Sequence, residues 1–280
     1  MLIKDKISIL MGIYNCASTL PEAIDSIIAQ TYTNWELIMC DDCSTDNTYE
    51  IAEEYRKKYP DKIKLIKNEK NSKLAFTLNH CLEEADGEYI ARMDGDDISI
   101  RDRFEKQINY LKTHPDIQLV GSSMQQFNEV DGNIAIVSKP EHTDKDTLKT
   151  SIPFNHATIM TYHYVYDELG GYTVSKRTER GQDYDLWFRF FAKGYIGDNR
   201  SEPLYLVRED MNAIKRRTFR VRWSVFRTTI FGYRLLGYPK KLLLKEFVIT
   251  LTKSLTPSKF QYWYRKLQQR KTENNKNSCN

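Results

Sequence analysis

Three aspartates, Asp94, Asp96 and Asp97, fall within four consecutive positions directly after the apolar run 89–93. Two like charges about 4 Å apart repel each other by roughly 4 kcal/mol at an intermediate dielectric. A chain keeps such carboxylates together easily only in open solvent or around a cation. Because these aspartates follow an expected strand, we expect them to hold a cation; in the alternative, Asp96 and Asp97 cap the segment that follows.

Polar residues also follow two other expected strands. Tyr14 and Asn15 come after the first strand, and Asp41 and Asp42 come after the second. The carboxyl ends of parallel strands meet at one edge of a sheet, where open α/β sheets bind ligands. Asp41 and Asp42 alone are also compatible with a solvated turn. The coincidence of three polar groups at one edge favours a binding site.

Alternating strands and helices are expected to position these residues. Buried apolar runs predict strands, and apolar residues at helical spacing predict helices. The expected order is strand 6–13, helix 20–30, strand 35–41, helix 47–58, strand 62–67, helix 73–85, strand 88–93 and helix 101–113. Ser44-Thr45-Asp46 is expected to cap the second helix. This alternation predicts an α/β fold with a mostly parallel sheet and helices on both faces.

The pattern is more mixed after residue 115. Segments 118–127 and 134–139, with Asp131-Gly132-Asn133 between them, predict a hairpin. Segment 153–160 predicts a loop that enters a strand, 164–169 a helix ending at Gly170-Gly171, and 183–193 an amphipathic helix. We expect one main domain over residues 1–210, a basic amphipathic helical region over 211–267, and a disordered tail over 268–280.

The net charge of +4 conceals an uneven distribution along the chain. From Met211 onward there are 17 lysines and arginines and only two acidic residues, Glu246 and Glu273. Residues 1–210 therefore carry an excess of acidic over basic side chains. This asymmetry predicts an acidic body joined to a basic segment that meets an anionic surface.

The termini and cysteines indicate a cytoplasmic location. The first apolar run starts too early and is too short for an export signal, and no apolar stretch approaches the ~20 residues that cross a bilayer. The five cysteines, an odd number, fit a reducing compartment. Cys40-x-x-Cys43 lacks the further ligands of a zinc site, which favours free thiols.

Taken together, the motifs resemble glycosyltransferase family 2, the inverting nucleotide-sugar transferases of GT-A fold. The resemblance spans roughly residues 7–208 and includes the segments 9–15, 41–46, 87–97, 156–158, 170–172 and 182–187. Within the family the chain is most similar to short bacterial enzymes that build O-antigen or capsule repeat units. The resemblance implies a nucleotide-sugar-binding half over residues 1–115 and an acceptor-binding half over 116–210.

The resemblance implies that the first two strand ends recognise the nucleoside of the donor, a UDP-sugar. Tyr14 would stack on the base beside Asn15, and Asp42 would accept a hydrogen bond from the uracil imide N–H. Lys73 stands where related enzymes carry a basic residue near the base. In the alternatives, Tyr14 packs in the core and Lys73 is a solvated residue at a helix start.

The aspartate group would serve the diphosphate. A divalent metal ion, Mn²⁺ or Mg²⁺, neutralises a diphosphate leaving group and suits carboxylate ligands. On an extended segment, Asp94 and Asp96 would project to the same side. The resemblance implies that Asp96 and Asp97 contact the ribose and the metal ion, with Asp94 close by. We therefore expect Asp96 and Asp97 to be the metal ligands, and Asp94 and Asp96 to bind the donor.

On the acceptor side the resemblance implies a general base, which removes a proton from the attacking sugar hydroxyl. The base of the family's Glu-Asp motif maps to Asp183, preceded here by Gln182. Loss of the acidic neighbour is expected to lower the proton affinity of Asp183 relative to a Glu-Asp pair. Asp185 is the rival candidate, which we interpret as structural. His156 would line the acceptor pocket or act as a structural hydrogen-bonding group.

The basic C-terminal region suggests where the acceptor lies. Aromatic and aliphatic residues alternate there with arginines and lysines, as in helices that lie on an anionic membrane surface. We expect docking on the inner face of the cytoplasmic membrane, beside a lipid-diphosphate-linked saccharide. In the alternative, the helices pack on the catalytic body.

The motif Phe219-Arg220-Val221-Arg222-Trp223 has the Arg-Trp of processive polysaccharide synthases but lacks their Gln. We therefore expect that one sugar is added per turnover.

Two other functions are possible. A nucleotidyltransferase that makes nucleotide sugars would need a glycine-rich basic loop after the first strand, which residues 14–18 do not supply. A nucleic-acid-binding protein would account for the basic C-terminal region but not for the aspartates. We therefore expect no nucleic-acid partner.

Overall fold

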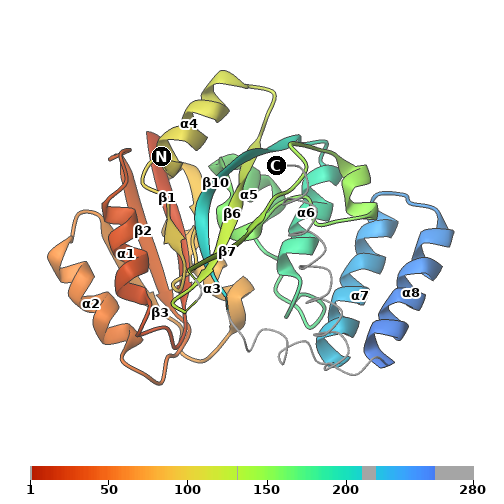
Figure 1. Ribbon diagram of the computed structural model, residues 1–280, viewed down its shortest axis with the longest axis horizontal. Coiled ribbons are helices and arrows are strands. Elements are labelled where there is room, and N and C mark those ends of the chain that lie inside the picture. The colour runs from red at the N-terminus through yellow and green to blue at the C-terminus, as the bar shows by residue number, and fades with distance from the viewer. Residues whose placement is uncertain (1, 131, 210–218, 256–280) are drawn as a thin grey trace.

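The computed structural model describes residues 2–130, 132–209 and 219–255 (Figure 1). The first half contains the alternating strands and helices that the apolar pattern predicts. They are β1 (Ile3–Ile13), α1 (Leu20–Ile28), β2 (Trp35–Asp41), α2 (Thr48–Lys58), β3 (Ile63–Lys67), α3 (Lys73–Glu83), β4 (Gly87–Arg92), β5 (Ile98–Ser99) and α4 (Arg103–Thr113). The short strand β5 is the one element of this half that the sequence did not indicate.

The expected cap of the second helix is wrong in detail. Asn47 is the N-cap residue of α2, and its side chain forms no capping hydrogen bond. Asp46 instead accepts hydrogen bonds from the backbone N–H of Thr48 at 3.1 Å and from its hydroxyl at 2.6 Å. A local turn closed by the Asp46 carboxylate thus replaces the expected cap.

The second half contributes the other strands of the sheet and the helices beside it. They are β6 (Leu119–Asn128), β7 (Gly132–Val137), β8 (His142–Thr143), two 3₁₀ turns at Lys145–Lys149 and His156–Thr158, β9 (Met160–Tyr162), α5 (His163–Leu169), α6 (Gln182–Ala192) and β10 (Gly197–Arg208). β6 and β7 form the expected hairpin. Asp131, in its turn, lies outside the described residues.

The sheet has the strand order β3-β2-β1-β4-β9-β6-β10-β5. The strands β3, β2, β1 and β4 are parallel, whereas β9 pairs antiparallel with both β4 and β6. The α/β fold with a mostly parallel sheet is therefore confirmed, and a wholly parallel sheet is not. β9 follows the 3₁₀ turn His156–Thr158 and not a crossover helix of the kind that joins parallel strands.

The strand β10 was not expected from the sequence, although it has 12 residues. It pairs parallel with β6, and its register shifts around Pro203, where the ladder loses an N–H donor. The segment around Pro203 also contains charged residues that hide the strand pattern. β10 is nevertheless the element that brings Tyr205 and Arg208 to the end of β4.

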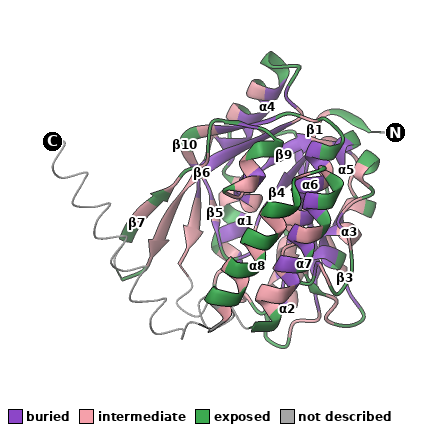
Figure 2. Cartoon of the chain, turned by 90° about the vertical axis from the view of Figure 1, so that its right-hand side faces the viewer, coloured by how far each residue is buried: buried purple, intermediate pink, exposed green. Residues whose placement is uncertain are grey.

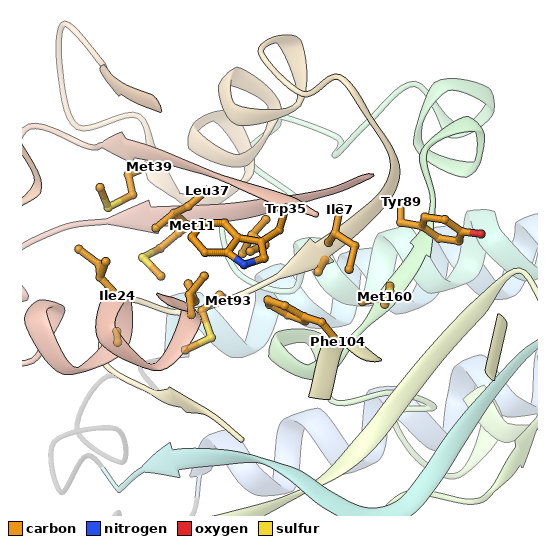
Figure 3. Close-up of a cluster of buried hydrophobic side chains, with 14 of the residues drawn as sticks. Ile7, Met11, Ile24, Trp35, Leu37, Met39, Tyr89, Met93, Phe104 and Met160 are labelled. Atoms are coloured by element: carbon orange, nitrogen blue, oxygen red, sulfur yellow. The ribbon is translucent and has the colours of Figure 1, made fainter. Parts of the chain in front are cut away.

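Both faces of the sheet are buried, as expected for strands covered by helices. Alternate residues of β1 point to opposite faces: Ile7 and Met11 belong to one core, and Leu10 belongs to the other. Figure 3 shows the first core, in which Ile24 of α1 and Phe104 of α4 also take part. The ends of β1 and β4 are thus fixed by packing on two sides.

Two further helices, α7 (Phe219–Leu235) and α8 (Lys240–Leu255), follow the sheet. α7 packs on α6, and α8 packs on the far side of α7 (Figure 1). Gly232 permits the first contact, because a Cβ atom there would lie 2.0 Å from the Phe188 ring. The rings of Trp223 and Phe226 contact Phe247 of α8, with centroids 6.2 and 5.8 Å apart.

Of the two helices in the basic region, α7 packs on α6 of the α/β domain, as the alternative expected. One face of α8 remains exposed (Figure 2). In the part of the chain that the structure describes, no helix has both the length and the apolar character to span a bilayer. The expected end of the basic region and the tail, residues 256–280, lie outside the described residues.

Candidate active site

Asp94, Asp96 and Asp97 lie in a tight turn between β4 and β5. The three carboxylates each offer an oxygen, and these oxygens lie within 4.8 Å of one another. The expected extended segment is therefore wrong: a turn at Gly95-Asp96, not strand periodicity, brings the side chains together. Gly95 suits this turn because a Cβ atom there would lie 3.1 Å from the Cys16 sulfur and 3.2 Å from Ile13.

The carboxylate turn is held in place by β10. The Tyr205 hydroxyl accepts a hydrogen bond from the Asp94 N–H at 3.1 Å. The Arg208 backbone N–H donates to Asp97 Oδ1 at 2.8 Å, and its guanidinium Nε donates to the Asp96 carbonyl at 3.0 Å. These positioning residues were missed because the strand that carries them has no clear sequence pattern.

The electrostatics of the turn favour a cation. Burial, together with the neighbouring charges of Asp94 and Asp96, raises the pKa of Asp97 to about 8. Arg92, a fully buried residue of β4, forms an ion pair with Asp94 and neutralises only part of this charge. A charged residue inside the apolar run 89–93 was the sequence signal that could have identified Arg92 as part of the site.

A cavity of about 820 Å³ lies beside the ends of β1 and β2. Tyr14, Asp42 and Lys73 all line it, and 49% of the Tyr14 side chain is exposed. Tyr14 therefore does not pack in the core. Asn15 does not line the cavity; its side-chain oxygen accepts a hydrogen bond from the Thr45 N–H at 2.8 Å and fixes the loop after β2.

Asp42 is buried and already accepts three hydrogen bonds. The donors are the Asn68 amide at 2.9 Å, the Ser72 N–H at 2.6 Å and the Lys73 N–H at 3.0 Å. Lys73 adopts a positive φ of 71°, which is unusual for a residue other than glycine. Asp42 therefore shapes the start of α3 and leaves little acceptor capacity for a base.

Asp183 lies in the first turn of α6 and is half-buried. Burial raises its pKa, and this effect is partly offset by two backbone N–H groups and by the charges of Arg92 and Lys139. The sequence argument considered only the missing acidic neighbour and did not include burial. A carboxylate with a raised pKa is better suited to accept a proton near neutral pH.

Asp185, the rival candidate for the general base, is engaged in structural contacts. Asp185 is buried and accepts hydrogen bonds from Thr173 at 2.6 Å and Arg189 at 2.8 Å, in addition to an ion pair with Arg177. Burial alone would raise the pKa of Asp185, but these partners lower it. The structure thus agrees with our interpretation of Asp185 as structural.

His156 is hydrogen-bonded to the Tyr172 hydroxyl at 2.7 Å. Burial, and then the nearby charge of Arg92, hold the pKa of His156 well below its usual range. His156 is therefore neutral at physiological pH and does not supply a cation.

The parts of the site are adjacent but do not share one cavity. Asp94, Asp96, Asp97 and Asp183 are not among the cavity's lining residues, whereas Gln182 is. Ile13 and Gly95 connect the cavity to the carboxylate turn, and the charge of Arg92 acts on both Asp94 and Asp183. The cavity therefore adjoins the carboxylate turn through Ile13 and adjoins Asp183 through its neighbour Gln182.

An open α/β sheet with polar side chains at the carboxyl ends of its strands indicates a ligand site at this edge. The chain belongs to the Glycosyl transferase family 2, whose model matches residues 8–170. It is 50% identical over 216 residues to EpsE of Bacillus subtilis, which is named as a glycosyltransferase; the match covers 76% of this chain and 77% of that protein. The protein is therefore a glycosyltransferase, and the resemblance inferred from its motifs is confirmed.

Two Escherichia coli proteins are also similar. The first is UDP-Glc:alpha-D-GlcNAc-diphosphoundecaprenol beta-1,3-glucosyltransferase WfaP, 31% identical over 195 residues, which cover 69% of this chain and 73% of WfaP. The second is O-antigen biosynthesis glycosyltransferase WbnJ, 31% identical over 210 residues, which cover 72% of this chain and 79% of WbnJ.

Solved structures of low sequence identity share the fold. TarS from S. aureus in complex with UDP-GlcNAc superposes with a TM-score of 0.64 at 17% identity, covering 82% of this chain and 70% of that one. The mannosyltransferase PcManGT from Pyrobaculum calidifontis, in complex with GDP-Man and Mn²⁺, has a TM-score of 0.63 at 18% identity, covering 87% and 69%. The GT-A fold is thereby confirmed.

Proposed function

We propose that this glycosyltransferase moves one sugar, with inversion, from a UDP-sugar to a hydroxyl of a lipid-diphosphate-linked saccharide in surface polysaccharide synthesis. The observation that carries the proposal is the carboxylate turn beside the cavity, with Asp183 next to Gln182 of the cavity lining. The names of WfaP and WbnJ, which refer to a diphosphoundecaprenol acceptor and to O-antigen biosynthesis, support the acceptor class. TarS, solved with UDP-GlcNAc, supports the donor class.

The carboxylate turn suits a divalent cation, Mn²⁺ or Mg²⁺. Three aspartate oxygens within 4.8 Å of one another form an all-oxygen ligand set of the kind that such ions prefer. When bound, the ion supplies charge neutralisation for the diphosphate leaving group. Asp96 and Asp97 are its proposed ligands, with Asp94 and Asp96 binding the donor. The bound Mn²⁺ in the PcManGT structure supports this assignment.

Asp183 is the proposed general base. It would accept the proton of the acceptor hydroxyl as that oxygen attacks the anomeric carbon. Direct attack by the acceptor inverts the configuration, so no protein nucleophile is required. Lys139 lies close enough to influence the pKa of Asp183 and would stabilise its charged form before proton transfer.

Nucleoside binding is assigned to the cavity. Tyr14 offers an exposed ring for stacking, with Asn15 fixing the strand end behind it and Lys73 at the start of α3. Asp42 is kept as a donor-binding residue mainly because it shapes this wall through Ser72 and Lys73. The Asp42 carboxylate already accepts three hydrogen bonds, so a uracil imide N–H could donate only to its remaining lone pair.

The exposed face of α8 supports membrane docking. Leu244, Val248 and Leu251 are 66%, 50% and 38% exposed, and Lys240 and Lys241 are exposed beside them. An apolar helix face bordered by lysines fits an anionic membrane surface. We therefore assign the enzyme to the inner face of the cytoplasmic membrane as a peripheral protein, with no nucleic-acid partner. Its membership of a glycosyltransferase family leaves the nucleotidyltransferase alternative without support.

A hydrolysis screen of nucleotide sugars tests the donor assignment. Wild-type enzyme and the Asp96→Ala variant are incubated with UDP-, GDP- and dTDP-sugars in the presence of Mn²⁺ or Mg²⁺. We expect release of UDP from one or more UDP-sugars by the wild type and not by the variant. Turnover that survives both chelation and the substitution contradicts the metal-dependent mechanism, and turnover of GDP- or dTDP-sugars alone contradicts the choice of UDP.

A further inference from the structure

The lining of the cavity contains several cations. The charged residues that line the cavity are Lys73, Lys176, Arg180, Arg220 and Arg227, together with the acids Asp42 and Glu179. Both acids are already engaged, Asp42 by its three donors and Glu179 by an ion pair with Arg220 at 3.3 Å. An anion that entered the cavity would therefore meet a net positive wall.

Three of these cations have no side-chain partner among the residues that the structure describes. Within residues 2–130, 132–209 and 219–255, no hydrogen bond or ion pair engages the side-chain nitrogens of Lys176, Arg180 or Arg227. Their charges gather at one wall although they repel one another, and folding gains nothing from an unpaired cationic cluster. Such a group is more readily explained by an anionic ligand.

The cluster is assembled by one face of α7. Arg220, Ser224 and Arg227 are four and then three residues apart, so they share a face of the helix. The Ser224 hydroxyl donates to the Arg177 carbonyl at 2.7 Å, and the Thr228 hydroxyl donates to the same carbonyl at 2.8 Å. These bonds fasten the loop that carries Lys176 and Arg180 against the arginines of α7.

We propose that Lys176, Arg180, Arg220 and Arg227 form a diphosphate-binding subsite for the lipid-linked acceptor, separate from the carboxylate turn. Guanidinium groups match phosphate oxygens in charge and in two-pronged geometry, and lysine adds a point charge. The inference rests on the proposed function, because it assumes that the acceptor carries a lipid diphosphate.

The position of α7 favours the acceptor over the donor. The donor diphosphate is assigned to Asp94, Asp96 and Asp97, none of which lines the cavity. α8 packs on the other side of α7 and carries the exposed apolar face (Figures 1 and 2). A diphosphate that projects from a membrane under α8 would therefore reach the cations of α7 before the carboxylate turn.

Calorimetric titration of the full chain with two probes tests the subsite. Farnesyl diphosphate represents the lipid diphosphate, and UDP with Mn²⁺ represents the donor. The variant is Arg220→Gln/Arg227→Gln; the charge-matched control is Arg101→Gln/Arg234→Gln, two exposed residues that do not line the cavity. We expect the variant to bind farnesyl diphosphate about tenfold or more weakly, since it loses two charge-assisted contacts. The control should stay within about twofold of wild type, and UDP binding should be unchanged in both.

Three results would overturn the subsite. Unchanged affinity of the variant for farnesyl diphosphate would show that these arginines do not bind it. An equal loss in the control would show that general surface charge is responsible. A loss of UDP affinity as large as that of farnesyl diphosphate would assign the cations to the donor. Thermal unfolding of each variant at the wild-type temperature verifies that the exposed substitutions leave the fold intact.

The Asp96→Asn variant separates this inference from the proposed function. It should weaken UDP binding in the presence of Mn²⁺ and leave farnesyl diphosphate binding unchanged. If UDP binding does not depend on Asp96, the donor site is wrong, while the result for Arg220 and Arg227 still decides the subsite.

Discussion

At the scale of single residues, two aspartates on one helix have different environments and hence different predicted roles. Asp183 is half-buried, with no guanidinium ion pair among the described residues, and its pKa is raised mainly by burial. Asp185 is fully buried and is held by Arg177 and Arg189, so its pKa is lowered. Although they are only two positions apart, Asp183 is therefore suited to accept a proton and Asp185 to act as a structural anion.

Replacing Asp183 by Asn is expected to lower the transfer rate by roughly 10²–10⁴-fold, the usual contribution of a general base. Because burial raises the pKa of Asp183, the wild-type transfer rate should fall as the pH drops through this raised pKa and the carboxylate becomes protonated. The pH–rate profile of the variant should lack this fall at acidic pH. The measurement is the rate of sugar transfer against pH, with UDP affinity as the control that should not change. A variant that keeps more than about a tenth of the wild-type rate would mean that another group removes the proton.

Replacing Asp185 by Ala is expected to lower the free energy of unfolding by about 3–5 kcal/mol, because it leaves buried guanidinium groups without their anion. Although burial acts against it, the hydrogen bonds and ion pairs of Asp185 lower its pKa in the folded state. Its stabilisation is therefore present above the pKa of an unfolded aspartate and is lost as the pH falls through the folded-state pKa. Urea unfolding at pH 7 and at acidic pH measures both effects. Equal stability of variant and wild type at pH 7 would refute the structural role.

At the scale of elements, the packing of α7 on α6 depends on a single glycine. Substituting Gly232 by Ala forces the new Cβ atom against the Phe188 ring and should cost about 1–3 kcal/mol of unfolding free energy. The matched test adds Phe188→Leu, which removes the ring and should recover part of the loss despite creating space. If the double variant is less stable than the sum of the single variants, the contact between α6 and α7 is not as described.

The exposed face of α8 leads to a second prediction at this scale. Replacing Leu244 and Val248 by Ser removes apolar surface from that face and should weaken binding to anionic vesicles several-fold. Val130, which is 91% exposed on the catalytic body, provides the control, and Val130→Ser should bind as wild type does. Vesicle flotation measures both. Undiminished binding of the α8 variant would assign membrane contact to another surface.

How much of the fold could be predicted depended on how regular each element is. β2 was predicted to the residue, because Trp35 and the apolar run Leu37-Ile38-Met39-Cys40 stand between polar segments. β10 was missed because Pro203 and its charged neighbours interrupt the pattern and its pairing with β6 is a long-range contact. The turn at Asp94–Asp97 was expected to be extended, since nothing local shows that Tyr205 and Arg208 fold it back.

The same distinction applies to the site. Tyr14 and Asp42 could be placed at one edge because parallel strands end together, and Lys73 was added by the family resemblance. The structure brings all three to one cavity. Arg220 and Arg227 could not, because α7 reaches that cavity only by packing on α6. Strand order predicts neighbours within a sheet, whereas contacts between distant helices depend on side-chain shape.

At the scale of the whole molecule, the charge asymmetry of the sequence corresponds to a division in space. The acidic residues 1–210 build the sheet and the carboxylate turn, and the described basic residues after 218 lie on α7 and α8. α7 contributes to the cavity on one side and supports α8 on the other. The proposed donor site, acceptor subsite and membrane surface therefore follow one another across the molecule.

The most direct test of the central claim is the metal dependence of sugar transfer. Enzyme stripped with a chelator is mixed with its UDP-sugar and a lipid-linked acceptor, and Mn²⁺ is then titrated in while transfer is measured. We predict no transfer before the addition, full recovery in the wild type, and no recovery in Asp96→Asn at any Mn²⁺ concentration that restores the wild type. Equal transfer by the stripped and the reloaded wild type, or full recovery of Asp96→Asn, would contradict a metal–diphosphate site at the carboxylate turn.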